Sequence, residues 1–249
     1  MTLSRRQKIT ALLLAIYWPA LFIFAHISVP RVVREADVSD KSLHFIAFLI
    51  LVFLLWFTVS DGRKVNWRIA APWCVLLTMG VYGILDEWLQ SYVAGRSCDA
   101  WDFFADMTST LTGLIMFSVL SFWPAGLLVT AIVIFGIANI SQVDLSDLMP
   151  AANTVFHLGA YALFTAFWIQ CLHLFLPTIS LRATRTGWLA AAFAAPVGLV
   201  LTVKLSSLVL GSEFSVPDMI ISFGSIAVTV ATVYLSASYH KRERKNPGS

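Results

Sequence analysis

Apolar residues in this chain form long continuous runs instead of the periodic stripes of a soluble protein. The runs are about 20 residues long, which as helices is enough to cross a hydrocarbon layer of about 30 Å. Helices suit that setting because they satisfy their own backbone hydrogen bonds. The pattern predicts eight membrane-spanning helices, at Ile9–Ile27, Leu43–Val59, Ile69–Leu89, Trp101–Trp123, Leu127–Ser141, Val155–Phe175, Gly187–Leu205 and Pro217–Ser238.

The composition agrees with an all-α integral membrane protein. Of the 249 residues, 58% are hydrophobic and 12% are charged, whereas a soluble domain carries about 25% charged residues. A soluble core of ordinary composition could not bury so much apolar surface. The basic residues are dispersed among short loops and the tail, with no basic segment interleaved with aromatic residues, so nucleic acid is not an expected partner.

The distribution of basic residues predicts the orientation of the helices. If the N-terminus is cytoplasmic, most of the 17 Lys and Arg residues fall on the cytoplasmic side. Arg31, Arg34, Lys41 and Arg96 fall on the other side, and Lys204 lies within a span. This asymmetry follows the positive-inside rule. It predicts that both termini are cytoplasmic and that the chain is a multi-pass protein of the bacterial cytoplasmic (inner) membrane.

The two halves of the chain resemble each other. Residues 40–45 align with residues 153–158, so that His44 matches His157. Asp102 and Asp218 likewise match at the starts of the fourth and eighth spans. An even number of spans in each half would give both halves the same orientation, related by a pseudo-two-fold axis along the membrane normal.

We therefore expect two parallel four-helix repeats, residues 1–124 and residues 125–249. The second repeat is interpreted as a degenerate copy that keeps the helical scaffold, because polar but uncharged residues replace the charged ones of the first. The replacements are Asn153 for Asp40, Ser212 for Arg96, Ser215 for Asp99 and Ser222 for Asp106.

Charged and polar side chains of the first repeat gather at the extracytoplasmic ends of its predicted helices. A spacing of four places Asp40 with His44 on one helix face and Asp86 with Gln90 on another. Ionisable residues that border a span usually face the bundle interior or a wet cavity. The sequence therefore predicts one ligand-binding cluster, made of Asp40, His44, Asp86, Glu87, Gln90, Arg96, Asp99, Asp102 and Asp106.

These segments resemble the signature of the VanZ-like membrane protein family. The segments that carry the resemblance are Asp86–Gln90, Gly95–Ser97, Asp99 and Asp102–Asp106, preceded by residues 40–45. The resemblance covers residues from about 9 to 123, and more weakly those from about 125 to 238. The residues that fall on family positions are Asp40, His44, Glu87, Gln90, Arg96, Asp102 and Asp106.

Two residues depart from the family pattern. Asp106 stands where many relatives have Asn, and Ser109 stands where Gly is common, which would alter helix packing there. The family takes its name from a glycopeptide-antibiotic (teicoplanin) resistance determinant. The resemblance therefore implies a role in the cell envelope, in glycopeptide resistance or in the assembly of an envelope polysaccharide.

Three kinds of function fit the cluster. In the first, it binds the headgroup of an envelope lipid or lipid-linked glycan. Arg96 would then contact a phosphate, because a guanidinium can bind two oxygens at once, and Mg²⁺ or Ca²⁺ would neutralise the surplus acids.

In the second, the cluster is structural and the chain is a scaffold for a protein of envelope biosynthesis. The carboxylates would pair with Arg96 and His44, since buried charges must be paired, and Lys204 would pair with a carboxylate of the first repeat. In the third, the protein is an enzyme acting on polyprenyl-phosphate lipids, with His44 or Glu87 as acid or base. The sequence holds no Gly-rich phosphate loop and no known nucleophile motif for that chemistry.

Overall fold

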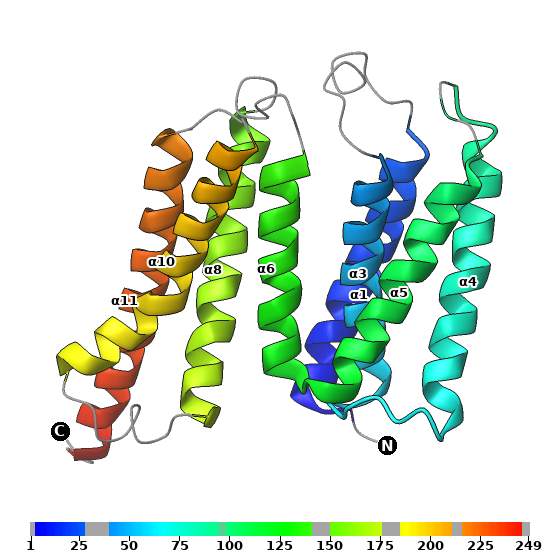
Figure 1. The fold of residues 1–249 in the computed structure, drawn as a ribbon. Coiled ribbons are helices and arrows are strands. Elements are labelled where there is room, and N and C mark those ends of the chain that lie inside the picture. The colour runs from blue at the N-terminus through cyan, green and yellow to red at the C-terminus, as the bar shows by residue number, and fades with distance from the viewer. Residues whose placement is uncertain are drawn as a thin grey trace. The chain divides into compact units, whose positions relative to one another are not determined.

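In the computed structural model all regular secondary structure of the described residues is helical, and no strand is found among them (Figure 1). The described residues are 3–27, 40–94, 96, 98–140, 150–175, 185–210 and 216–245. The helices are α1 (Arg5–Ala25), α3 (Asp40–Val59), α4 (Ala70–Gln90), α5 (Ala100–Val119), α6 (Phe122–Ile140), α8 (Pro150–Phe175), α10 (Arg185–Val209) and α11 (Val216–Lys245). Each coincides with one predicted span, so the predicted all-α class is confirmed.

Six of the described helices are long and apolar enough to cross a membrane, namely α1, α3, α6, α8, α10 and α11. This supports a multi-pass membrane protein. The two remaining helices, α4 and α5, carry the acidic residues of the predicted site, which lowers their mean hydropathy. That α4 and α5 also cross the membrane remains a prediction, as does the orientation of the bundle.

The chain divides into two compact units, Met1–Val143 and Asp144–Ser249. The division differs from the predicted one at residue 124, which followed the sequence repeat, because α6 packs with the first unit. Phe122 at the start of α6 contacts Phe53 and Phe57 of α3, with ring centroids 5.6 and 5.2 Å apart. Ala125 and Val129 of α6 also belong to the core of that unit.

Helix α3 is the centre of the first unit and contacts α1, α4, α5 and α6. This explains why it is apolar on every face, as expected of a helix surrounded by other helices. Its Leu49 and Val52 have no exposed surface. Helix α5 approaches α3 closely at Gly113, where a Cβ atom would lie 2.7 Å from Cγ1 of Val52. Small residues permit this kind of close helix approach in membrane proteins.

The second unit consists of α8, α10 and α11, with α8 packed against both of the others. Its buried residues include Tyr161 and Ile169 of α8 and Ile226 and Val230 of α11. One polar contact ties α8 to α10, where the indole nitrogen of Trp168 donates to the carbonyl of Ala191 at 2.8 Å.

Candidate functional site

The predicted site residues come together where α3 begins, α4 ends and α5 begins, which is the same end of the first unit (Figure 1). We call this group the polar cluster and define it as His44, Asp86, Glu87, Gln90, Arg96, Asp99, Asp102 and Asp106. Most of its members are buried, and Asp86, Glu87, Gln90 and Asp106 are each at most 3% exposed. Helix α3 begins at Asp40, but the side chain of that residue lies outside the described part of the chain.

A hydrogen bond between His44 and Asp106 joins α3 to α5 inside the cluster. The Nδ1 atom of His44 lies 3.0 Å from Oδ1 of Asp106, and both side chains are buried. One turn further along α5, the hydroxyl of Ser109 donates to the carbonyl oxygen of Phe45 at 2.6 Å. Ser109 stands where Gly is common in the VanZ-like pattern, and its hydroxyl therefore adds a second polar contact between α3 and α5.

The end of α4 carries a chain of side-chain hydrogen bonds. The amide nitrogen of Gln90 donates to Oδ2 of Asp86 at 2.7 Å, across the spacing of four that the sequence indicated. Arg96, in the segment after α4, donates through Nη1 to Oε1 of Gln90 at 3.1 Å. Together these contacts hold the segment that joins α4 to α5 against the last turn of α4.

Glu87 and Asp99 fix the start of α5. The backbone N–H of Asp99 donates to Oε2 of Glu87 at 2.9 Å. Asp99 in turn caps α5 by accepting from the backbone N–H of Trp101 at 2.9 Å. Lys41 of α3 adds a charge to this region, because its Nζ atom lies 3.3 Å from Oδ2 of Asp99 and 3.7 Å from Oδ1 of Asp102.

The pKa of Asp99 lies below its usual value, chiefly because the Trp101 N–H donates to the ionised carboxylate and secondarily because of Lys41. A depressed native pKa means that the carboxylate stabilises the fold above its unfolded-state pKa. That contribution is lost as the pH falls through the lower native value.

Several buried polar atoms of the cluster have no hydrogen-bond partner among the described residues. They include Oδ1 of Asp86, Oε1 of Glu87, Oδ2 of Asp106 and Nε of Arg96. A buried polar group without a partner costs about 1–3 kcal/mol, and native proteins usually satisfy such groups. The hydrogen bonds within the cluster therefore leave acceptors and one donor available for a ligand.

Two residues near the cluster were not among the predicted site residues. His26, at the end of α1, has its Nδ1 atom 3.9 Å from Oδ1 of Asp86, while the same atom bonds the carbonyl oxygen of Phe22 at 2.7 Å. Lys41 lies in the segment of residues 40–45 that carries part of the family resemblance, but no role was predicted for it. His26 had no helical spacing to link it to the cluster, because its neighbours come from another helix.

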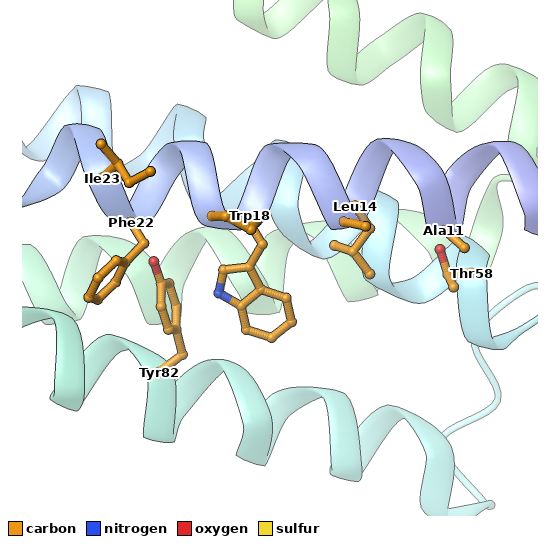
Figure 2. Close-up of a pocket in the computed structure, with 9 residues that line it drawn as sticks. Ala11, Leu14, Trp18, Phe22, Ile23, Thr58 and Tyr82 are labelled. Carbon is orange, nitrogen blue, oxygen red and sulfur yellow. The ribbon is translucent and has the colours of Figure 1, made fainter.

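A groove of about 660 Å³ lies between α1 and α4, with one edge formed by α3 (Figure 2). Trp18 and Phe22 project from α1 into this space, and Tyr82 projects toward them from α4. The lining is almost wholly apolar and consists of Ala11, Leu14, Ala15, Trp18, Pro19, Phe22, Ile23, Thr58 and Tyr82.

The end of the groove that holds Phe22 and Tyr82 is the end near the polar cluster. The ring of Phe22 stacks on His26 with centroids 4.2 Å apart, and His26 adjoins Asp86. Tyr82 lies one turn before Asp86 on the same face of α4. The apolar groove and the polar cluster are thus neighbours within the first unit.

The first unit matches a known protein family. The family model described as VanZ/LLP1 matches residues 4–121. Residues 4–121 are therefore a VanZ-like region. The match runs from α1 to the end of α5, and so includes the polar cluster and the groove. No curated protein and no solved structure matches the chain.

The second unit repeats two contacts of the VanZ-like unit, one of them with an uncharged side chain in place of a carboxylate. The Nδ1 atom of His157 lies 3.0 Å from the hydroxyl of Ser222, and the hydroxyl of Ser225 donates to the carbonyl oxygen of Leu158 at 2.6 Å. These distances equal those of the His44–Asp106 and Ser109–Phe45 contacts in the VanZ-like unit.

Asp218 keeps its place in the second unit but has different neighbours. It accepts a hydrogen bond from Asn153 at 2.7 Å and lies 3.7 Å from Nε2 of His157. Lys204 lies on α10 of the second unit. The predicted ion pair between Lys204 and a carboxylate of the first repeat stays a prediction.

Proposed function

We propose that this VanZ-like protein binds an envelope lipid or a lipid-linked glycan, with the headgroup at the polar cluster and the hydrocarbon chain in the groove between α1 and α4. One observation carries this proposal. One end of the apolar groove lies near Asp86, with His26 between them, and Oδ1 of Asp86 is buried with no hydrogen-bond partner among the described residues.

The groove suits a hydrocarbon chain. Its lining is apolar over nearly its whole length, and α1 is long and apolar enough to lie in the membrane. Lipid chains are therefore what this surface would meet, and close packing against the groove, not transfer out of water, would hold one there. The aromatic rings of Trp18, Phe22 and Tyr82 offer flat faces for a long unbranched or prenyl chain.

The polar cluster suits a headgroup that donates hydrogen bonds. The free oxygens of Asp86 and Glu87 can accept from the hydroxyls of a sugar or from an ammonium group. Arg96 and Lys41 supply positive charge for a phosphate next to that sugar. Because acidic residues outnumber basic ones here, a sugar phosphate fits the cluster better than a bare phosphate does.

The second unit supports binding over a purely structural role for the cluster. Its α8 and α11 pack together through His157 and Ser222, without the carboxylate that Asp106 supplies in the VanZ-like unit. Pairing of these two helices therefore does not require a carboxylate at the position of Asp106. Burying one costs free energy unless it is paired, so a ligand gives the carboxylates of the VanZ-like unit a reason to be present.

The matched contacts also support a proposal that the two units arose by duplication, as two parallel four-helix repeats. On this proposal α6 originated as the first helix of the second repeat, although its side chains now pack on the first unit. The second repeat would have lost the charged cluster and kept the helical scaffold, which matches the replacement of Asp106 by Ser222.

We further propose that the polar cluster faces the extracytoplasmic side of the bacterial cytoplasmic membrane. Cys98 tests this, because it is exposed in the segment between α4 and α5. A membrane-impermeant maleimide is expected to label Cys98 in right-side-out vesicles, with the label lost in Cys98→Ser. Labelling confined to inside-out vesicles would place the cluster in the cytosol and remove the envelope ligand.

Lipid binding is expected to depend on both ends of the site. The probe is a fluorescent polyprenyl-phosphate hexose, titrated against the full chain in nanodiscs of phosphatidylethanolamine and phosphatidylglycerol. Trp18→Ala shortens the aromatic wall of the groove and Arg96→Ala removes the phosphate contact. Each is expected to weaken binding about tenfold, which corresponds to about 1.4 kcal/mol.

Trp188→Ala is the matched control for that experiment, because Trp188 lies on α10 of the second unit and packs on Tyr234. It should bind the probe as the unmodified chain does. Equal affinity of the unmodified chain and all three variants for the probe would contradict the proposal. Binding of the bare polyprenyl chain with the same affinity as the hexose would leave the headgroup assignment without support and favour a scaffold for an envelope-biosynthesis protein.

A further inference from the structure

We propose that His44, Glu87 and Asp106 bind a divalent transition-metal ion, Zn²⁺ or Mn²⁺. One ligand atom from each of the three side chains lies within 4.8 Å of the other two. All three residues are buried, at 8%, 3% and 0% exposure. They come from α3, α4 and α5, so a shared ion would join three helices at one point.

The ligand set selects the class of metal. Mg²⁺ and Ca²⁺ prefer oxygen ligands alone, and the surplus of acidic residues in the predicted cluster suggested those ions. The assembled site contains one imidazole nitrogen with two carboxylates, a combination that suits Zn²⁺ or Mn²⁺. Ligand atoms about 2.1 Å from a tetrahedral ion lie about 3.4 Å apart, so small side-chain rotations would close the present spacing.

The free oxygens of the site give independent support. Oε1 of Glu87 and Oδ2 of Asp106 are buried and have no hydrogen-bond partner among the described residues. Their other oxygens are used, in the bonds to the Asp99 N–H and to His44. Two negative charges buried this close together are costly without a counter-charge, and a divalent ion supplies one.

In the second unit, the helix pair that corresponds to α3 and α5 is α8 and α11, and it lacks this set of three candidate metal ligands. Ser222 takes the place of Asp106 against His157, at the same 3.0 Å distance. No second cluster of at least three candidate ligands is found among the described residues. A carboxylate at the position of Asp106 is therefore dispensable for this helix contact.

Three protein ligands would leave at least one coordination position open. That position could hold water, or an oxygen of the headgroup in the proposed lipid complex. The metal site does not depend on the lipid, however, because its three ligands are all supplied by the chain.

The test uses the full chain, purified, stripped with a chelator and titrated separately with Zn²⁺ and Mn²⁺ by calorimetry. We expect about one ion bound per chain. Asp106→Ser and Glu87→Gln are each expected to weaken binding by about 100-fold or more, since even loss of an outer-shell partner costs 10- to 100-fold. Asp218→Ser, which removes a buried carboxylate beside His157, is the matched control and should bind as the unmodified chain does.

Asp106→Ser copies the arrangement of the second unit, so it is expected to stay folded, and the unfolding temperature of the metal-free protein checks this. Absence of stoichiometric Zn²⁺ or Mn²⁺ binding by the folded unmodified chain would overturn the proposal. Unchanged affinity in folded Asp106→Ser, or tighter binding of Mg²⁺ or Ca²⁺ than of both transition metals, would overturn it as well. None of these results would bear on lipid binding at the groove.

Discussion

Gln90→Leu is expected to destabilise the VanZ-like unit by about 3 kcal/mol. Gln90 is 1% exposed and connects two groups, accepting from Arg96 and donating to Asp86. A leucine fills the same space but leaves Asp86, which is 2% exposed, without its 2.7 Å hydrogen bond. Leaving a buried acceptor without its hydrogen-bond partner costs about 1–3 kcal/mol, and more for a carboxylate than for a neutral group.

Unfolding of the purified protein in mixed detergent and denaturant measures this loss. The double variant Asp86→Leu with Gln90→Leu provides the decisive comparison, because replacing both partners by apolar groups is much less costly than removing one. We expect the double variant to regain most of the lost stability. If the two single changes and the double change were simply additive, Asp86 and Gln90 would not be coupled as their hydrogen bond requires.

Gly113→Ala is expected to destabilise the same unit by about 1–3 kcal/mol, the usual cost of overpacking a buried site. The added Cβ would lie 2.7 Å from Cγ1 of Val52 and 3.4 Å from Cδ1 of Leu49. Both neighbours have no exposed surface, and a β-branched valine in a helix has one strongly preferred rotamer. Helix α5 would therefore have to move away from α3.

Gly224→Ala in α11 is the control, because a Cβ atom at Gly224 meets nothing within 4 Å. The same change there is expected to be neutral or to stabilise the helix by up to about 1 kcal/mol, since Ala is the better helix former. The same unfolding measurement compares the two proteins. Equal stability would contradict a close approach of α5 to α3 at Gly113.

The His44–Asp106 bond lies inside the helix contact that Gly113 permits. Since α5 would move as a unit, Gly113→Ala bears on the site as well as on stability. This links the packing of α3 on α5 to the geometry of the polar cluster.

The amino-acid sequence by itself determined the helices of this protein. Apolar runs such as the one in α3 are local signals, and they placed every described helix. The predicted ends were less accurate, since α11 continues past Ser238 to Lys245, and the predicted end at Ser141 lies outside the described residues. Helical spacing also joined Asp86 to Gln90, because residues four apart on one helix must share a face. The family resemblance identified the residues of the polar cluster for the same reason, because the spacings that define the family pattern lie within short segments of the chain.

Only the tertiary structure decided which helices meet. The pairing of His44 with Asp106 spans 62 residues, and the groove is formed by α1, α3 and α4 together. The position of α6 on the first unit, with Phe122 against Phe53 and Phe57, is likewise a matter of side-chain packing. Such contacts depend on how apolar surfaces fit between helices, and hydropathy along the chain carries no information about that fit, because every face of an apolar helix looks alike in sequence.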